Sequence, residues 1–97
     1  MKRKTAVKLT RLDMTEHLKE PEDAAVYLSQ VLADGNDGEF LRALGHIARA
    51  RGMAAVARES GLGRESLYKA LVPGARPRYD TVLRVARAVG IRLSASV

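Results

Sequence analysis

Glycines divide residues 36–90 into short segments, and the apolar residues of each segment recur every three or four positions. That spacing is typical of amphipathic helices, and glycine ends a helix readily because it accepts the left-handed conformation. The pattern predicts a helix ending at Arg51, followed by helices at Met53–Ser60, Arg64–Leu71 and about 79–89. Helices this short are marginal alone in water, so we expect an all-α fold in which their apolar faces pack together.

Two residue pairs have the spacing of a capping box, in which side chains satisfy free backbone N–H groups at the start of a helix. Asp13 and Glu16 predict a short helix over residues 14–19. Asn36 and Glu39 predict the start of the helix that ends at Arg51. Between them, Pro21 is suited to a first helical position, and it opens a helix that Gly35 ends. The apolar stripe of that helix consists of Ala24, Leu28, Val31 and Leu32.

The C-terminal residues change to a two-residue period, which is typical of a half-buried strand. Here apolar and polar residues alternate, and the apolar ones are Ile91, Leu93, Ala95 and Val97. A single strand needs a partner. We expect this short C-terminal strand to pair with its copy across a two-fold axis, so that its apolar residues form the dimer contact. The alternative is an extended tail packed on its own core.

The length of 97 residues, of which 46% are hydrophobic, allows one modest core. Residues 1–12 have no capping signal and are expected to form a flexible basic arm. Residues 13–97 are then a single domain, with acidic helices over 13–35, a core over 36–90 and a tail over 91–97.

The sequence contains no cysteine, which excludes a disulfide framework and fits a reducing compartment. No apolar run approaches the roughly 18 residues of a membrane-spanning helix. The basic start lacks the apolar stretch of a signal peptide. We therefore expect a cytoplasmic protein with no membrane association.

Charge is distributed unevenly along the chain, whose net charge is +6. Residues 1–12 carry five basic side chains and no acidic one, residues 13–40 carry eight acidic and one basic, and residues 41–97 carry eleven basic and three acidic. A basic region attracts a polyanion such as DNA, whereas an acidic surface suits a basic protein. Solvated charged faces without a partner are the alternative interpretation.

Residues 53–72 have the spacing of two short helices that cross through a tight turn. Ala57 falls where the helices meet, and Gly61 falls at the turn, where a positive φ costs glycine least. The side chains expected to point into the core are Val56, Leu62, Leu67, Ala70 and Leu71. The pattern predicts a helix-turn-helix, the motif that places its second helix in the major groove of DNA.

Four residues on the outward face of the second helix are the candidates for reading bases. Arg64 and Lys69 can donate to guanine, and Glu65 can accept from cytosine. Tyr68 can contact a thymine methyl group or a phosphate. Contacts to the DNA backbone, which fix register without reading sequence, are expected from Met53, Ala54, Ser66, Arg76 and Arg78.

An enzymatic function has little support. His17 and His46 lack an arrangement of acidic residues at ligand spacing, so surface or packing roles are expected for them. Gly61 and Gly63 lack the lysine and the preceding strand of a phosphate-binding loop. We expect no catalytic residues, no metal and no cofactor.

Two stretches of the sequence resemble a known family. Residues 41–53 (LRALGHIARARGM) and 57–71 (ARESGLGRESLYKAL) are similar to the addiction-module antidote proteins, which are HigA-like antitoxins of the XRE helix-turn-helix group. Residues 18–32, 77–81 and 89–94 continue the likeness, which covers about residues 12–94. The resemblance implies a lambda-repressor-like five-helix domain, here with an N-terminal helical extension.

The resemblance also implies a function. Such antitoxins neutralise a basic RelE/HigB-like toxin that cleaves mRNA, and as dimers they bind double-stranded operator DNA and repress their own operon. Charge places the toxin contact on the acidic segment, with Asp13, Glu16, Glu20, Glu22 and Asp23 as candidates. The alternatives are a stand-alone XRE-type transcriptional regulator without a toxin, and a protein-binding module with a vestigial helix-turn-helix.

Overall fold

Five helices follow one another in residues 16–97, the part of the chain that the computed structural model describes. They are α2 (Pro21–Asp34), α3 (Asp37–Arg51), α4 (Met53–Ser60), α5 (Arg64–Leu71) and α6 (Tyr79–Ala88). Residues 16–18 add a helical turn before α2. The expected basic arm over 1–12 and the expected cap at Asp13 lie outside the described residues. The prediction of an all-α fold is confirmed, and the bounds predicted for α4 and α5 match.

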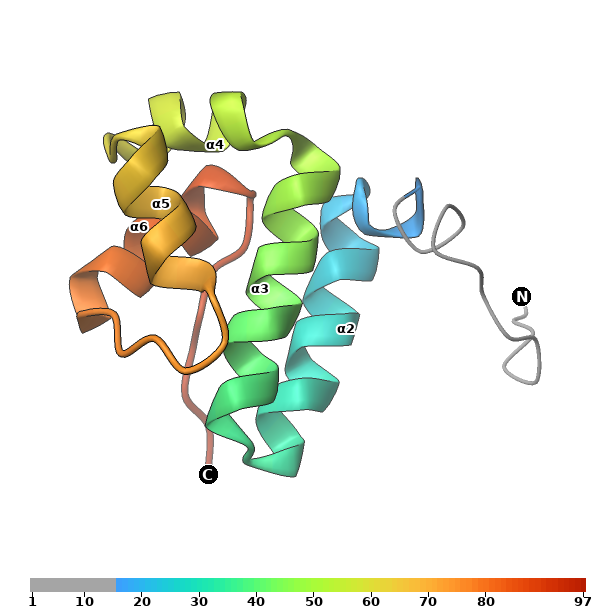
Figure 1. Cartoon of the computed structure of the whole chain (residues 1–97). Helices are drawn as coiled ribbons and strands as arrows, with labels where there is room; N and C mark the ends of the chain where they lie inside the picture. The colour runs from blue at the N-terminus through green and yellow to red at the C-terminus, as the bar shows by residue number, and fades with distance from the viewer. Residues whose placement is uncertain (1–15) are drawn as a thin grey trace.

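Helix α3 lies at the centre of the molecule (Figure 1). It forms an antiparallel hairpin with α2 on one side, and on the other side it contacts α4 and α5. Helix α4 crosses one end of α3 and packs on α5 and α6. Helix α2 therefore packs mainly on α3. No helix within residues 16–97 is long and apolar enough to cross a bilayer.

The turn between α2 and α3 follows the local chemistry of its two residues. Gly35 has φ 74° and donates its N–H to the Leu32 carbonyl, a left-handed end that glycine adopts at little cost. Asn36 then caps α3, because its Oδ1 accepts the Glu39 N–H at 3.0 Å. The predicted helix end at Gly35 and the predicted cap at Asn36 are both confirmed.

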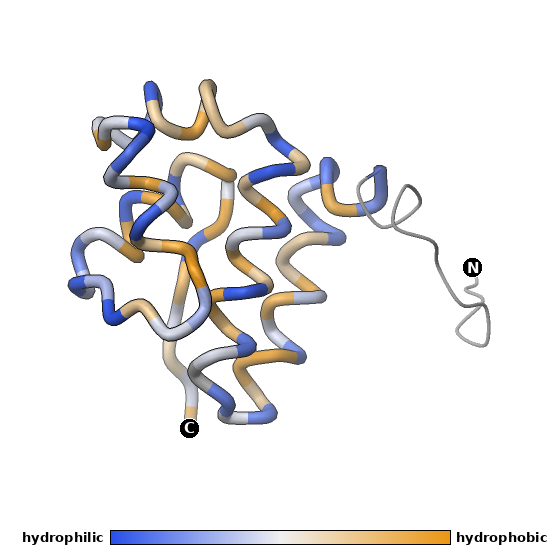
Figure 2. The backbone as a smooth tube through the Cα atoms, in the orientation of Figure 1, coloured by the Kyte–Doolittle hydropathy of each residue, from blue (hydrophilic) through white to orange (hydrophobic). Residues whose placement is uncertain are grey.

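The core draws on every helix. The largest fully buried side chains are Leu28, Leu44, Ile47, Val56, Leu67, Val85 and Val89. Figure 2 shows these helices as alternating hydrophobic and hydrophilic stretches, as expected when one face of each is buried. One member of the predicted α2 stripe departs from the pattern, because Leu32 is 49% exposed. It lies in the last turn of α2, where it lines a surface recess together with Phe40 and Leu41 of α3.

Residues 91–97 contain no strand. The Ile91 N–H donates to the Ala86 carbonyl at 2.9 Å, and the Ile91 side chain is buried in the core. Leu93 is partly buried against the same core, whereas Ala95 and Val97 are exposed. The tail thus packs on its own chain, and the strand expected here does not form within it. Ile91 thus closes α6 with its backbone and fills the core with its side chain, whereas the predicted pairing of the tail with a second copy stays a prediction.

Candidate nucleic-acid interface

Helices α4 and α5 are joined by a turn of three residues, 61–63. Gly61 has φ 79°, the left-handed conformation predicted for it. Ser60 is buried, and its Oγ donates to the Ala57 carbonyl and accepts the Leu62 N–H, both at 3.3 Å. The buried hydroxyl therefore replaces hydrogen bonds that the chain loses where α4 ends. Sequence reasoning missed Ser60, although serine near a helix end is a known signal for such a contact.

Helix α5 is held against the core by its inner face. Leu67 and Leu71 are buried, and Leu62 and Ala70 are partly buried. Gly45 of α3 allows the end of α5 to approach, since a β-carbon at Gly45 would lie 3.6 Å from the Leu71 carbonyl oxygen. With its inner face fixed in this way, α5 presents a defined outer face to solvent.

The four residues predicted to read bases all lie on that outer face. Arg64, Glu65, Tyr68 and Lys69 are exposed, and within residues 16–97 none of their side chains forms a hydrogen bond or an ion pair. Tyr68 leaves 40% of its surface in contact with solvent. The charged groups of α5 are therefore free to bind an external partner.

The residues predicted to contact a DNA backbone divide into two groups. Ala54, Ser66, Arg76 and Arg78 are exposed, as such a contact requires. Met53 is buried in the core, with 8% of its surface exposed. Its side chain is therefore not available to a ligand, because the first residue of α4 is used to pack this helix on the core. Only the backbone of Met53 remains near the surface predicted for DNA.

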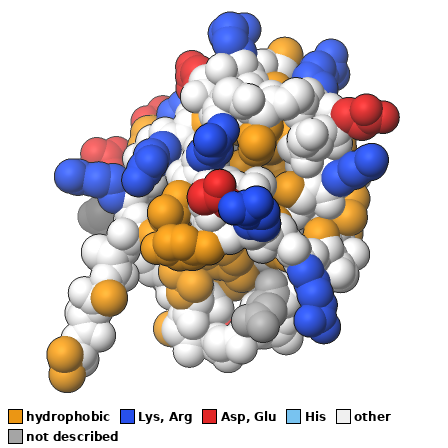
Figure 3. Space-filling view, turned by 90° about the vertical axis from the view of Figure 1, so that its left-hand side faces the viewer, with side chains coloured by type: hydrophobic (Ala, Val, Ile, Leu, Met, Phe, Trp, Pro, Cys, Tyr) orange, Lys and Arg blue, Asp and Glu red, His pale blue; other side chains and the backbone are white. Residues whose placement is uncertain are grey.

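The loop between α5 and α6 adds two of these arginines to the same face. Arg78 pairs with Asp80 at 3.3 Å between Nε and Oδ1, and both side chains are largely exposed. Arg76 has no ion pair among the described residues. Figure 3 looks onto this side of the molecule and shows Lys and Arg side chains spread across it.

Two further residues on α6 were missed by sequence reasoning. Tyr79, the first residue of α6, is 74% exposed beside Arg78. Arg84 reaches the turn between α4 and α5, since its Nη1 would lie 3.6 Å from a β-carbon at Gly61. A signal for Tyr79 exists in the sequence, because this aromatic residue directly follows Arg-Pro-Arg and lies outside any apolar stripe.

Acidic side chains gather on the other side of α3. Of the acidic residues predicted to bind a toxin, Glu20 and Glu22 are exposed, and Asp13 lies outside the described residues. Glu16 pairs with Lys19 at 2.9 Å, and Asp23 lies 3.5 Å from His17 Nδ1. Both pairs are solvent-exposed, so they add little to the stability of the fold.

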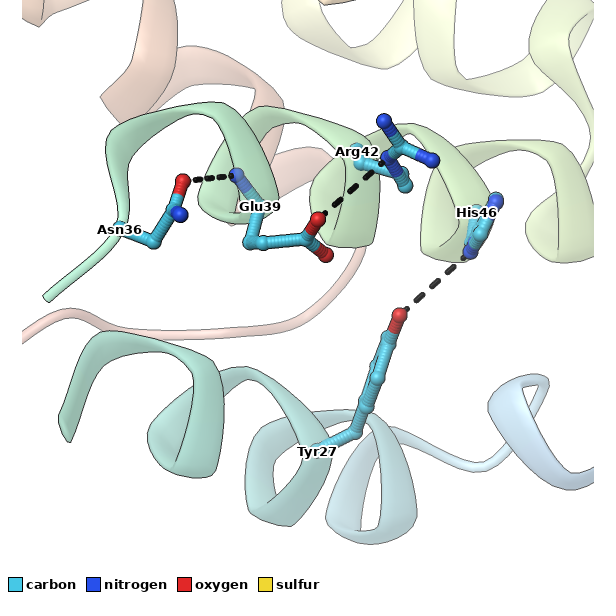
Figure 4. Close-up of polar contacts among 5 residues, drawn as sticks. All are labelled: Tyr27, Asn36, Glu39, Arg42 and His46. Carbon is cyan, nitrogen blue, oxygen red and sulfur yellow. Dashed lines mark hydrogen bonds and ion pairs between the residues drawn. The ribbon is translucent and has the colours of Figure 1, made fainter. Parts of the chain in front are cut away.

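The contact between α2 and α3 includes a polar pair (Figure 4). The Tyr27 hydroxyl lies 3.4 Å from His46 Nδ1, and Glu39 lies 3.9 Å from Arg42 Nε on the same side of α3. Burial raises the pKa of Tyr27, the Glu39 carboxylate raises it further, and Arg42 acts in the opposite direction. His46 is thus an exposed residue of α3 that contacts Tyr27 across the hairpin.

The structure defines a small all-α protein with exposed basic residues on α5 and α6 and exposed acidic residues on α2. The chain belongs to the family described as “Probable addiction module antidote protein”, whose model matches residues 8–97. It is also similar to an uncharacterized protein of Haemophilus influenzae, at 42% identity over 84 residues, which are 87% of each chain. No solved structure matches it. An antidote of an addiction module acts against a toxin, and the family likeness drawn from the sequence is confirmed at that level.

Proposed function

We propose that this antidote binds the operator of its own operon through α4 and α5, acting as a helix-turn-helix. The observation that carries the proposal is the outer face of α5, where Arg64 and Lys69 are exposed and have no ion partner among the described residues. Desolvating a charged group without a partner is costly. Phosphates and guanine edges supply such a partner. When a basic side chain binds a phosphate, the counterion of that phosphate is released, and this release favours binding.

Within this proposal the residues have two kinds of role. Arg64, Glu65, Tyr68 and Lys69 read base edges in the major groove. Ala54, Ser66, Arg76 and Arg78 lie along the phosphates and fix the register of the protein on the duplex. The Asp80 carboxylate weakens the attraction of Arg78 for a phosphate, because the two side chains already form an ion pair. Arg76 is therefore the stronger of the two phosphate contacts.

The operator-bound form is proposed to be a dimer. Two copies related by a two-fold axis place their reading helices about 34 Å apart, so the operator is an inverted repeat with half-sites about one turn apart. The exposed end of the tail, Ala95 and Val97, is the remaining candidate from the predicted dimer contact. Ile91 and Leu93 contribute indirectly, because they anchor the tail to the core.

The toxin of the module is proposed to be a basic protein of the RelE/HigB-like type. Its positive charge is attracted by the acidic surface of α2, where Glu20 and Glu22 are exposed. The start of α2 and helix α5 lie on opposite sides of α3 (Figure 1), so one antidote can hold a toxin and DNA at once. The antidote then acts as a repressor and an inhibitor, without chemistry of its own, in the cytoplasm.

The test is a mobility-shift titration of the DNA upstream of the antidote gene, at two salt concentrations, with and without the toxin of the module. Specific binding that the toxin alters is the expected result. Specific binding that is indifferent to the toxin would favour a stand-alone XRE-type regulator. No preference over random DNA would exclude operator recognition and leave a protein-binding module.

A further inference from the structure

A groove of about 590 Å³ lies between the corner that joins α2 to α3 and the loop that joins α5 to α6. Its apolar lining includes Val31, Leu32, Phe40, Ala75, Pro77 and Val82, and Arg76 stands on its loop side. In Figure 3 hydrophobic side chains gather in the lower half of the face, below basic ones. The groove thus joins the acidic hairpin to the loop that carries the proposed phosphate contacts.

The groove exposes apolar surface that the fold itself leaves uncovered. Leu32 is 49% exposed, although it belongs to the apolar stripe of α2. Val31, Phe40 and Val82 are only partly buried at the edge of the core. A contiguous apolar recess of this kind is typical of a place where a partner inserts side chains.

The two ends of the groove differ in charge: Arg76 lines the loop side, and Asp34 lies next to the lining residue Gly35 at the α2 end, where it indicates the charge of the partner group. Asp34 is the last residue of α2, and the last turn of this helix contains no basic residue. Helix carbonyls give this end a partial negative charge, so a carboxylate here is unfavourable for the free chain. Asp34 is exposed and has no ion pair among the described residues. A basic side chain brought by a partner would relieve this repulsion.

We propose that the groove is the anchor site for the basic toxin of the module, which inserts an apolar side chain beside Leu32 and places a basic one at Asp34. The inference rests on the proposed function and adds the location of the contact. The acidic residues at the start of α2 then steer the encounter, since exposed charges act mainly on association rates. The apolar groove determines how long the complex lasts.

Occupation of the groove also acts on the DNA-binding loop. Among the described residues, the backbone of 73–77 makes a single hydrogen bond to other backbone groups, from the Ala75 N–H to the Val72 carbonyl. A side chain packed on Ala75 and Pro77 restricts this loop, which positions Arg76 and Arg78. Binding to phosphates then costs less conformational entropy, so toxin and operator reinforce each other's binding.

The experiment compares two exposed apolar residues of α2 that lie on different faces. Leu32→Glu changes the groove, and Val26→Glu is the matched control, because Val26 is 58% exposed and does not line the groove. Toxin affinity is measured by calorimetry with the purified toxin. We expect Leu32→Glu to weaken toxin binding by about tenfold or more and Val26→Glu by less than about threefold. Leu32→Glu should also remove the enhancement of operator affinity by toxin.

Asp34→Lys gives a second test that a folding defect cannot imitate. A lysine at the end of α2 suits the helix dipole, so this variant should unfold at a higher temperature than the parent. It should nevertheless bind the toxin more weakly. Methyl resonances of the unsubstituted antidote give a third measurement, in which Leu32 and Val82 should shift on adding toxin while Val26 does not.

Three results would contradict the inference. Loss of toxin binding in Val26→Glu, with Leu32→Glu unaffected, would move the contact to the outer face of α2 and overturn the inference alone. Conversion of a dimer to a monomer by Leu32→Glu would overturn it too, since the groove would then join two copies. An unsubstituted antidote that binds operator but no toxin would overturn the inference together with the toxin half of the proposed function.

Discussion

Gly45 of α3 lies against Leu71 of α5, so closely that a β-carbon at Gly45 would stand 3.6 Å from the Leu71 carbonyl oxygen and 3.8 Å from its Cβ. These are ordinary contact distances, which a methyl group satisfies and a larger side chain does not. The position of α5, and with it the proposed reading face, is therefore set by a small residue in the middle of α3.

Gly45→Ala should raise the free energy of unfolding by about 0.5–1 kcal/mol, because alanine is favoured over glycine inside a helix. The nearest atom, Arg49 Nη1 at 3.1 Å, ends a flexible side chain that can move. Gly45→Leu should instead lower the free energy of unfolding by about 1–3 kcal/mol, since it forces α5 outward. Urea denaturation measures both. Destabilisation by Gly45→Ala would show that Gly45 and Leu71 lie closer together than these distances indicate.

Ser60→Ala removes the hydroxyl that serves both the Ala57 carbonyl and the Leu62 N–H. We expect a loss of about 1–2 kcal/mol in the free energy of unfolding, because a partly buried N–H is left without its acceptor. Ser66→Ala is the control, since Ser66 is exposed on α5 and its hydroxyl forms no hydrogen bond within the described residues. Its effect should stay within about 0.5 kcal/mol. Equal effects of the two substitutions would argue against a role for Ser60 in the turn.

Tyr27 should make the fold sensitive to alkaline pH. Its pKa is raised in the folded protein, so the neutral form stabilises the fold. This contribution is present below the ordinary tyrosine value of about 10 and is lost as pH rises through the higher, folded value. Tyr27→Phe should therefore reduce the fall in urea midpoint between about pH 9 and about pH 11. Tyr79→Phe, at an exposed position, should leave that fall unchanged.

Arg64 and Arg76 should differ in the kind of affinity that they supply. Arg64→Ala should relax the preference for one base pair, at a cost of about 1–3 kcal/mol on the preferred sequence. Arg76→Ala should weaken binding to all sequences alike and reduce the dependence of log affinity on log salt by about one unit. Titrations of operator and single-base variants at several salt concentrations separate the two. Identical behaviour of both variants would remove the distinction between reading and positioning residues.

Much of the fold was predictable because its signals are local. The bounds of α4 and α5, the helix end at Gly35 and the cap at Asn36 depend on residues within one turn of each other. These helix bounds and caps can therefore be predicted from the order of the residues alone, through backbone preferences and helical periodicity. The exposed position of Arg64 followed from the same periodicity.

Other features depend on which surfaces meet, and the sequence pattern does not contain that information. Met53 is buried rather than exposed because α4 crosses the end of α3. Ile91 is buried rather than part of an open strand because the chain after α6 turns back onto the core.

The sequence by itself determined the helices, their ends and the separation of acidic from basic segments, since short-range preferences and composition decide these. The tertiary structure alone decided that Gly45 admits Leu71, that the start of α2 and helix α5 lie on opposite sides of α3 (Figure 1) and that Leu32 lines a groove. The physical reason is that close packing depends on the shapes of residues far apart in the chain, and such contacts exist only when the helices have docked.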